Sequence, residues 1–139
     1  DPRLAIAYDH RGITRKDMGD LEGSMEDFSK AIEIDPQASN TYYNLGNLYW
    51  QQEDYTAALQ AYEKTVELKP DDWDARYNLA ITYLALQDMD GALPLLEQLA
   101  EEMPDNVSVW KELGRIYAHK GKIEESKRAY SLAETLQAD

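Results

Sequence analysis

Four of the five prolines in this chain, Pro2, Pro36, Pro70 and Pro104, follow one another at intervals of 34 residues. Proline ends an α-helix because it lacks a backbone N–H donor and disfavours helical geometry in the residue before it. Stops at this constant interval are typical of a repeated pair of helices. One helical hairpin cannot bury both of its faces, so such a chain buries its apolar residues between neighbouring units.

Other residue types recur at the same interval. They form a column of small residues (Gly12, Gly46, Ala80 and Gly114), two columns of bulky residues (Phe28, Tyr62, Leu96 and Tyr130; Leu21, Tyr55, Met89 and Ile123) and a column of aspartates (Asp20, Asp54 and Asp88). The small residues predict that two helix backbones approach closely at that point. The aspartates predict caps for the helices that follow them, because a short carboxylate accepts hydrogen bonds from the first N–H groups of a helix. Lys122 interrupts that column in the last unit.

These columns resemble the tetratricopeptide repeat (TPR) pattern of Trp-x2-Leu-Gly-x2-Tyr, then Ala-x3-Phe, then Pro. The matching residues are Trp110, Leu113, Gly114, Tyr117 and Tyr130 in the fourth unit, Tyr42, Leu45, Gly46, Tyr49, Ala58, Tyr62 and Pro70 in the second, Leu79, Ala80, Tyr83, Ala92 and Pro104 in the third, and Tyr8, Gly12, Phe28, Ala31 and Pro36 in the first. The first unit departs from the pattern, with Arg11 and Arg15 where Leu and Tyr belong. The resemblance implies an all-α fold, an α-solenoid of stacked antiparallel helix pairs wound into a right-handed superhelix.

By this pattern residues 1–139 form a single TPR array, with units of about 5–38, 39–72, 73–106 and 107–139. Asp1-Pro2 resembles Asp35-Pro36, which closes a unit, and there is no initiator methionine. No polar capping helix follows Leu136, although solenoids need one over their last apolar face. We therefore expect a fragment of a longer chain; alternatively, the open ends of the array self-associate.

The third unit carries Gly91 and Pro94 early in its second helix. Glycine costs about 1 kcal/mol of helix propensity relative to alanine, and proline removes a hydrogen bond and crowds the preceding turn. We therefore expect this helix to start late or to be kinked.

Charge and hydropathy exclude several kinds of partner. The net charge of −13 argues against nucleic acid, because phosphate-binding surfaces need Lys and Arg. No apolar run approaches the ~20 residues of a membrane-spanning helix, so no membrane insertion is expected. Residues 35–102 hold 3 basic and 13 acidic side chains, whereas residues 103–139 hold 6 of each. The acidic middle is either a solvated convex face or a surface that attracts a basic segment.

No set of residues here is suited to catalysis, so we expect no enzyme activity, no cofactor and no metal. His10 and His119 are the only histidines, and there is no cysteine. Neighbouring carboxylates such as Glu101 and Glu102 diverge on a helix and are interpreted as solvated charges.

The TPR resemblance implies that the first helices of successive units line a concave groove that binds a peptide segment of another protein. The candidate groove residues are Tyr43, Asn47, Trp50, Tyr77, Asn78, Ile81, Lys111, Arg115 and His119. Tyr43, Trp50 and Tyr77 offer flat apolar area with little side-chain entropy to lose. Asn47 can donate to and accept from an extended backbone, and Lys111 and Arg115, with His119, could hold a carboxylate. The alternative is that tyrosines and asparagines at these positions belong to the TPR scaffold in general.

The TPR domains that bind the C-terminal carboxylate of heat-shock chaperones use two asparagines and three cations. The equivalent positions here are Tyr43, Asn47, Asn78, Ser108 and Glu112, which keep both asparagines and lack all three cations. We therefore reject that ligand. Two function classes remain: an adaptor that binds a partner's segment, and a module for assembly with other copies or neighbouring repeats.

Overall fold

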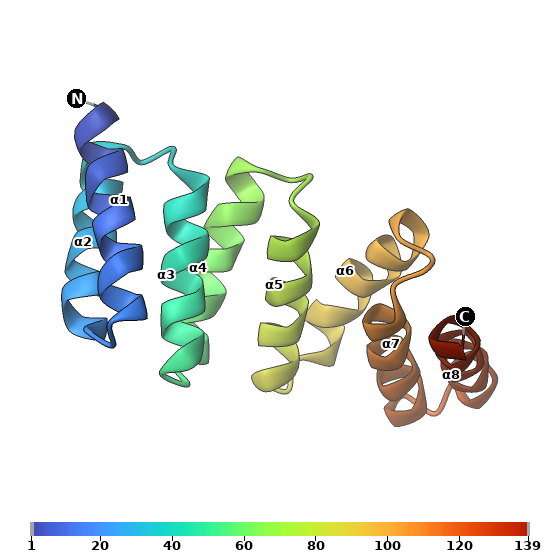
Figure 1. Cartoon of the computed structure of the whole chain (residues 1–139). Helices are drawn as coiled ribbons and strands as arrows, with labels where there is room; N and C mark the ends of the chain where they lie inside the picture. Colours follow the sequence, from blue (N-terminus) through green and yellow to red (C-terminus); the bar gives the residue numbers. More distant parts are fainter. Residues whose placement is uncertain (1, 139) are drawn as a thin grey trace. The chain divides into compact units, whose positions relative to one another are not determined.

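The computed structural model describes residues 2–138, which form eight α-helices. Figure 1 shows them following one another as hairpins, with no strand among the described residues. The helices are α1 (Pro2–Asp17), α2 (Leu21–Ile34), α3 (Ser39–Gln51), α4 (Tyr55–Leu68), α5 (Trp73–Ala85), α6 (Met89–Glu102), α7 (Val107–His119) and α8 (Ile123–Ala138). The all-α prediction and the expected pairing of helices are confirmed.

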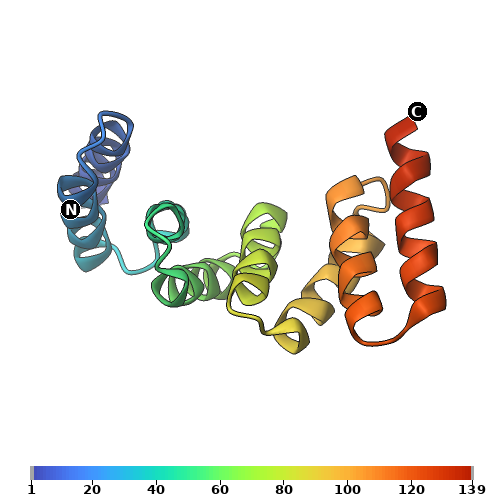
Figure 2. The same cartoon turned by 90° about the horizontal axis from the view of Figure 1, so that it is seen from below.

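The chain divides into two compact units, which meet between Ala75 and Arg76. In the first unit α1 pairs with α2 and α3 with α4, while α2 packs on α3 and α1 touches α3. In the second unit α6 packs on α7, and α7 pairs with α8, as Figure 2 shows. That all four hairpins form one continuous array stays a prediction.

The turn inside each hairpin has one repeated design. Asp20, Asp54 and Asp88 accept hydrogen bonds from the N–H groups of Gly23, Ala57 and Gly91 at 3.0, 3.0 and 2.8 Å, which confirms the predicted caps. The residue just before each cap position has a positive φ, and the four are Gly19 (83°), Glu53 (60°), Gln87 (62°) and Gly121 (73°). Two of these turns therefore hold a side chain in the left-handed region that favours glycine.

The glycines of the small-residue column contact an aromatic ring of the second helix of their hairpin, and not its backbone. A Cβ atom on Gly46 would lie 2.7 Å from the nearest atom of the Tyr62 ring, and one on Gly12 would lie 2.8 Å from that of Phe28. In the second unit Gly114 is covered in the same way by Tyr130. Our expectation of a backbone-to-backbone approach thus needs refinement, because the glycine makes room for an aromatic side chain of the second helix.

The core of each unit forms where one hairpin meets the next. Phe28 of α2 packs with Leu45 and Leu48 of α3, and the larger cluster of the second unit joins α5, α6, α7 and α8. Phe28 and Leu96 are fully buried, whereas Tyr130 on α8 is 40% exposed. Tyr130 is therefore less covered than the residues of the same column on α2 and α6.

Pro94 does not delay its helix. Helix α6 begins at Met89, directly after its Asp88 cap, at the same phase as α2, α4 and α8. Of the two alternatives that we expected, the late start is wrong, because Asp88 caps α6 and Pro94 is only its sixth residue, where one backbone N–H to the first turn is lost. The kink stays a prediction. The Pro94 side chain is exposed, so its ring displaces nothing from the core.

Candidate functional site

In the first unit the first helices of two hairpins meet along a polar seam. The Asn44 side chain on α3 donates to Oδ1 of Asp9 on α1 at 3.3 Å. The predicted residues Tyr43, Asn47 and Trp50 lie four and three residues apart, so they share one face of α3. This face is half-buried and combines aromatic area with an amide.

Asn47 is held in place by the second helix of its own hairpin. The Tyr62 hydroxyl on α4 donates to Oδ1 of Asn47 at 2.7 Å, and the Tyr62 ring lies 5.9 Å from that of Tyr43. Burial of the Tyr62 side chain raises the pKa of its hydroxyl. The Asn47 amide therefore has a fixed orientation, with its carbonyl oxygen engaged and its NH2 group as the donor. Sequence reasoning assigned Asn47 but missed this supporting role of Tyr62.

Trp50, at the end of α3, packs against the ring of Tyr55 at the start of α4, with ring centroids 4.8 Å apart. Its indole is thus packed at the turn of its own hairpin, with the two ring planes tilted by 59°, while remaining partly accessible.

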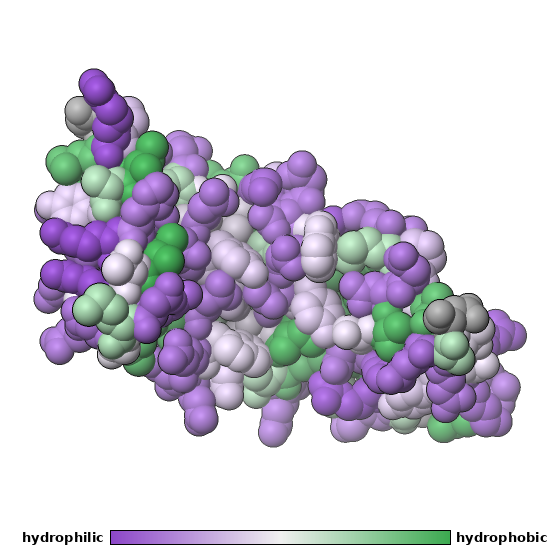
Figure 3. All heavy atoms as spheres, viewed as in Figure 1, coloured by the Kyte–Doolittle hydropathy of each residue, from purple (hydrophilic) through white to green (hydrophobic). Residues whose placement is uncertain are grey.

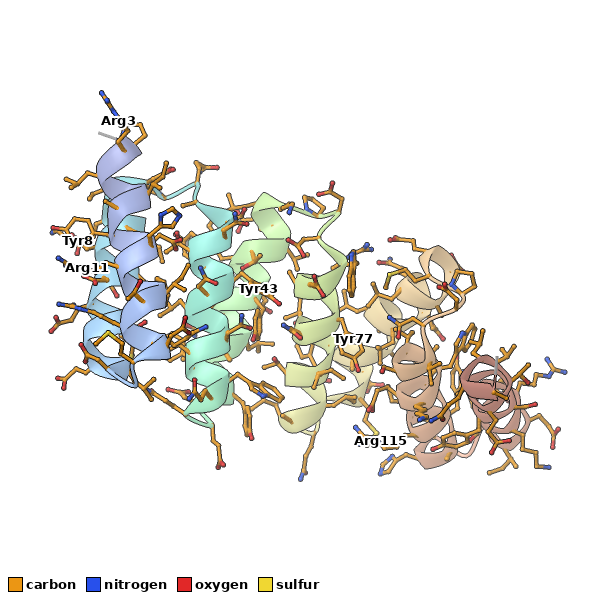
Figure 4. The ribbon with its side chains drawn as sticks, viewed as in Figure 1. Arg3, Tyr8, Arg11, Tyr43, Tyr77 and Arg115 are labelled. Carbon is orange, nitrogen blue, oxygen red and sulfur yellow. The ribbon has the colours of Figure 1, made fainter. Side chains whose placement is uncertain are left out.

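In the second unit the candidate site lies where α5 faces α7. Tyr77 projects from α5 on the side of α7 (Figure 4), and Asn78 and Ile81 beside it are half-buried. Burial raises the pKa of the Tyr77 hydroxyl, the charge of Glu112 raises it further, and a hydrogen bond with Ser108 and the charge of Arg115 oppose this rise. Tyr77 therefore sits among three polar groups of α7, of which only Arg115 was among the predicted site residues.

The negative charge of the Glu112 carboxylate is only partly compensated by its neighbours. Its Oε2 atom is buried and lies 2.8 Å from Nη2 of Arg115, yet makes no well-aligned hydrogen bond. This contact is an ion pair between neighbouring turns of α7, and the Arg115 side chain is 60% exposed. A ligand group can therefore reach Arg115, although that cation already has an anion beside it.

The three predicted carboxylate contacts of α7, Lys111, Arg115 and His119, do not converge on one point. Nζ of Lys111 donates to Oε1 of Gln137 on α8 at 3.2 Å. His119 lines a separate hollow with Asp88, Asp90 and Lys120, at the turns of the two hairpins of this unit. Of these three residues, Arg115 is therefore the one that lies beside Tyr77 and can contact a ligand carboxylate.

A charged cluster that sequence reasoning missed lies on the first hairpin. Asp27 of α2 is 2% exposed and accepts hydrogen bonds from two nitrogens of Arg11, including Nε at 2.7 Å, while Nη1 of Arg15 lies 3.2 Å away. These hydrogen bonds from Arg11 hold the pKa of the Asp27 carboxyl below its usual range. The Arg11 guanidinium also lies 5.1 Å from the centroid of the Tyr8 ring. In Figure 4 Tyr8 and Arg11 project away from α3, and hydrophilic atoms gather on that edge in Figure 3.

A signal for this cluster was present in the sequence. Asp27 stands in a column that otherwise holds Ala61, Leu95 and Ala129, in the same unit in which Arg11 and Arg15 replace Leu and Tyr. Three coincident departures from one pattern predict an ion pair, because a buried carboxylate needs a cation.

Within residues 2–138, no three acidic or histidine side chains gather in a way that could hold a metal ion. In the same stretch, no helix has the length and apolar character of a membrane span.

Comparison with known proteins identifies the family. Three family models described as tetratricopeptide repeats match residues 12–53, 43–102 and 83–139. A human protein named tetratricopeptide repeat protein 6 is 32% identical over 47 residues, which are 34% of this chain and 9% of that protein.

Solved structures share the fold over nearly the whole chain. MamA superposes with a TM-score of 0.89 at 23% identity, covering 99% of this chain and 81% of MamA. YrrB, described as a TPR protein with an unusual peptide-binding site, superposes with a TM-score of 0.87 at 25% identity, covering 95% of this chain and 68% of YrrB. The models and the helix pairs agree, and the chain belongs to the tetratricopeptide repeat family.

Proposed function

We propose that this protein is an adaptor whose first-helix faces bind a peptide segment of a partner protein. TPR repeats are protein-interaction modules, and the family is typically non-catalytic. In the first unit the proposed binding surface is the face of α3 that carries Tyr43 and Asn47. In the second unit it is the face of α5 and α7 around Tyr77.

The environment of the Tyr77 side chain is the main observation that supports this proposal. A half-buried tyrosine with a hydroxyl beside Ser108, Glu112 and Arg115 supplies apolar area, hydrogen-bond donors and acceptors, and both signs of charge within one small region. Rigid aromatic side chains next to charge-assisted hydrogen-bond partners are typical of residues that dominate binding energy. The likeness to YrrB, which has a peptide-binding site, gives independent support.

The second-unit face around Tyr77 presents both a cation and an anion to a ligand. A ligand carboxylate gains Arg115 but meets the charge of Glu112, whereas a backbone N–H or a hydroxyl can approach the Glu112 side chain, which is 23% exposed. We therefore expect the second-unit face to read backbone and uncharged polar groups in preference to a free C-terminal carboxylate.

Affinity capture with paired variants tests the proposal. One variant, Tyr43→Ala with Asn47→Ala, removes the first-unit face; another, Tyr77→Ala with Arg115→Glu, removes the second. A control, Thr56→Ala with Gln98→Ala, changes exposed residues of second helices. Circular dichroism must first show that all three are folded.

We expect a partner that binds the parent and the control and is lost or weakened by at least one face variant. A partner retained equally by both face variants would contradict the proposal and move the binding site to another surface.

Self-association is the second candidate, and α8 favours it. This helix exposes Ile123, Tyr130 and Leu132 by 53%, 40% and 44%. Beside them stand Lys127 and Glu134, both exposed, at positions where α6 has Leu93 and Ala100. The open apolar end that we expected after Leu136 is therefore a mixed surface. Sizing at several concentrations, with Ile123→Gln and Leu132→Gln as a variant, decides whether it holds copies together.

A further inference from the structure

The second unit has another hollow, on the opposite side of α7 from Lys111 and Arg115. Its lining residues come from α6 and α7 and are Glu97, Ala100, Glu101, Trp110, Leu113 and Tyr117. On an α-helix Trp110, Leu113 and Tyr117 share one face, and at about 100° per residue Lys111 and Arg115 point elsewhere. We call this hollow the α6–α7 crevice; it takes no part in the proposed adaptor site.

Two aromatic side chains of the α6–α7 crevice are fixed by hydrogen bonds at their edges. The Trp110 indole N–H donates to the carbonyl oxygen of Pro104 at 2.8 Å, and the Tyr117 hydroxyl donates to Oε1 of Glu97 at 2.8 Å. Burial of the Tyr117 ring, together with this hydrogen bond and the Glu97 charge, raises its pKa to about 12. Both rings are therefore held in place before any ligand arrives.

A cation of the chain itself already lies near one ring of the crevice. Nζ of Lys122 lies 5.6 Å from the centroid of the Tyr117 ring, within the range of a cation–π contact. The exposed carboxylates of Glu97 and Glu101 add negative charge at the rim, above the apolar floor of Ala100 and Leu113. Aromatic faces and carboxylates around an apolar floor suit a cation on an aliphatic stem.

A hollow in the first unit uses the same first-helix positions as the α6–α7 crevice. It is lined by Tyr42, Leu45, Tyr49, Ala57, Gln60 and Ala61. Tyr42, Leu45 and Tyr49 occupy the repeat positions of Trp110, Leu113 and Tyr117, but none of these lining residues is acidic. That hollow opens toward α4, the second helix of the same hairpin, whereas the α6–α7 crevice lies between two hairpins, so the two hollows share only their first-helix positions. One repeat earlier in the sequence, the positions of Glu97 and Glu101 are occupied by Glu63 and Glu67.

We propose that the α6–α7 crevice binds an arginine or lysine side chain from a basic segment of a partner protein. The aliphatic stem lies on Ala100 and Leu113, the cation meets the faces of Trp110 and Tyr117, and Glu97 and Glu101 accept its hydrogen bonds. The net charge of −13 attracts such a segment before contact.

Peptide titration monitored by NMR tests this proposal. The chain has three tryptophans, so the indole N–H signals of Trp50 and Trp73 serve as references for that of Trp110, which Trp110→Phe assigns. The probe is an acetylated, amidated hexa-arginine peptide, and hexaglutamate is the peptide control. A Glu97→Gln, Glu101→Gln variant removes the crevice carboxylates. The variant Glu22→Gln, Glu26→Gln makes the same charge change at exposed positions of α2.

We expect hexa-arginine to shift the Trp110 signal with saturation while the two reference signals stay in place. Loss of both crevice carboxylates should weaken binding by about tenfold, and the α2 variant should bind nearly as the parent does. An unmoved Trp110 signal, an equal shift of all three indoles, a comparable shift with hexaglutamate or equal weakening in the two glutamine variants would each overturn the proposal.

Discussion

The first and second hairpins have the same backbone plan but opposite chemistry at three repeat positions. The second hairpin has Leu45, Tyr49 and Ala61, and Leu45 packs with Phe28 of α2. The first hairpin has Arg11, Arg15 and Asp27 at the equivalent positions, joined as an ion cluster.

The difference shows that the repeat pattern specifies shape more strictly than polarity. Leu45 is 8% exposed because α2 covers it, whereas the Arg11 side chain is 55% exposed on a face that no described helix covers. An apolar residue is stabilising there only when a neighbouring hairpin buries it. Charged residues that satisfy one another are the alternative, and the Asp27 carboxylate, though nearly inaccessible to water, is matched by two guanidinium groups.

The largest expected effect comes from breaking this cluster on one side. Replacing Arg11→Leu and Arg15→Tyr copies the second hairpin but leaves the Asp27 carboxylate without a cation. We expect the melting temperature to fall by roughly 5–10 °C, because removing the partners of a buried charge costs far more than the pair contributes. Thermal unfolding followed by circular dichroism measures the change.

Adding Asp27→Ala to that double substitution completes the copy and serves as its control. The triple variant should recover most of the lost melting temperature, since apolar replacement of a buried ion cluster is often neutral. A triple variant as unstable as the double one would show that the first hairpin needs its charges for another reason.

A smaller effect is expected from acid. The lowered pKa of Asp27 means that its contribution to stability is present above the unfolded-state pKa, near 3.9, and is lost as the pH falls through the folded-state value. The parent should therefore lose more melting temperature between pH 7 and pH 3 than the triple variant does. Asp90 and Glu102 also have lowered pKa values, but both proteins contain them, so their effect cancels. Parallel acid curves for the two proteins would contradict this role of Asp27.

The smallest expected effect concerns the turns of the same two hairpins. The left-handed residue is Gly19 in the first hairpin and Glu53, with φ of 60°, in the second. Glu53→Gly should stabilise the protein by about 0.5–1 kcal/mol, because glycine adopts this conformation without strain. Gln60→Gly, in the middle of α4, is the control and should destabilise by about 1 kcal/mol. Chemical denaturation of both variants gives the two values, and equal signs would contradict the explanation.

Most of the fold could be predicted because the repeat interval acts on residues with strict local roles. Proline stops a helix and aspartate caps one, and each of these roles depends on the chain nearby. The small residues predicted a close contact between helices but not that an aromatic ring makes it. The left-handed conformation of Glu53 and Gln87 escaped prediction because neither residue type demands it. The start of α6 at Met89 was not predicted, because the effect of the Asp88 cap was not compared with that of Pro94.

The candidate site was less predictable, because it depends on pairs of side chains from different helices. Sequence alone could place Asn47 and Tyr77 on first helices, since helical spacing fixes the face. It could not show that Tyr62 orients Asn47 or that Glu112 meets both Tyr77 and Arg115. Sequence alone also could not show that Lys111 donates to Gln137, because the partner of a long side chain depends on which helix lies next to it.

Site-specific photo-crosslinking tests most directly whether the first-helix faces bind a partner. A photoreactive phenylalanine analogue is placed in turn at Tyr43, at Tyr77 and, as a control, at exposed Gln98 on α6. If these faces bind a partner, irradiation joins a partner protein at position 77, at position 43 or at both, and not at position 98. Crosslinks formed only from position 98, or equally from all three, would contradict such binding.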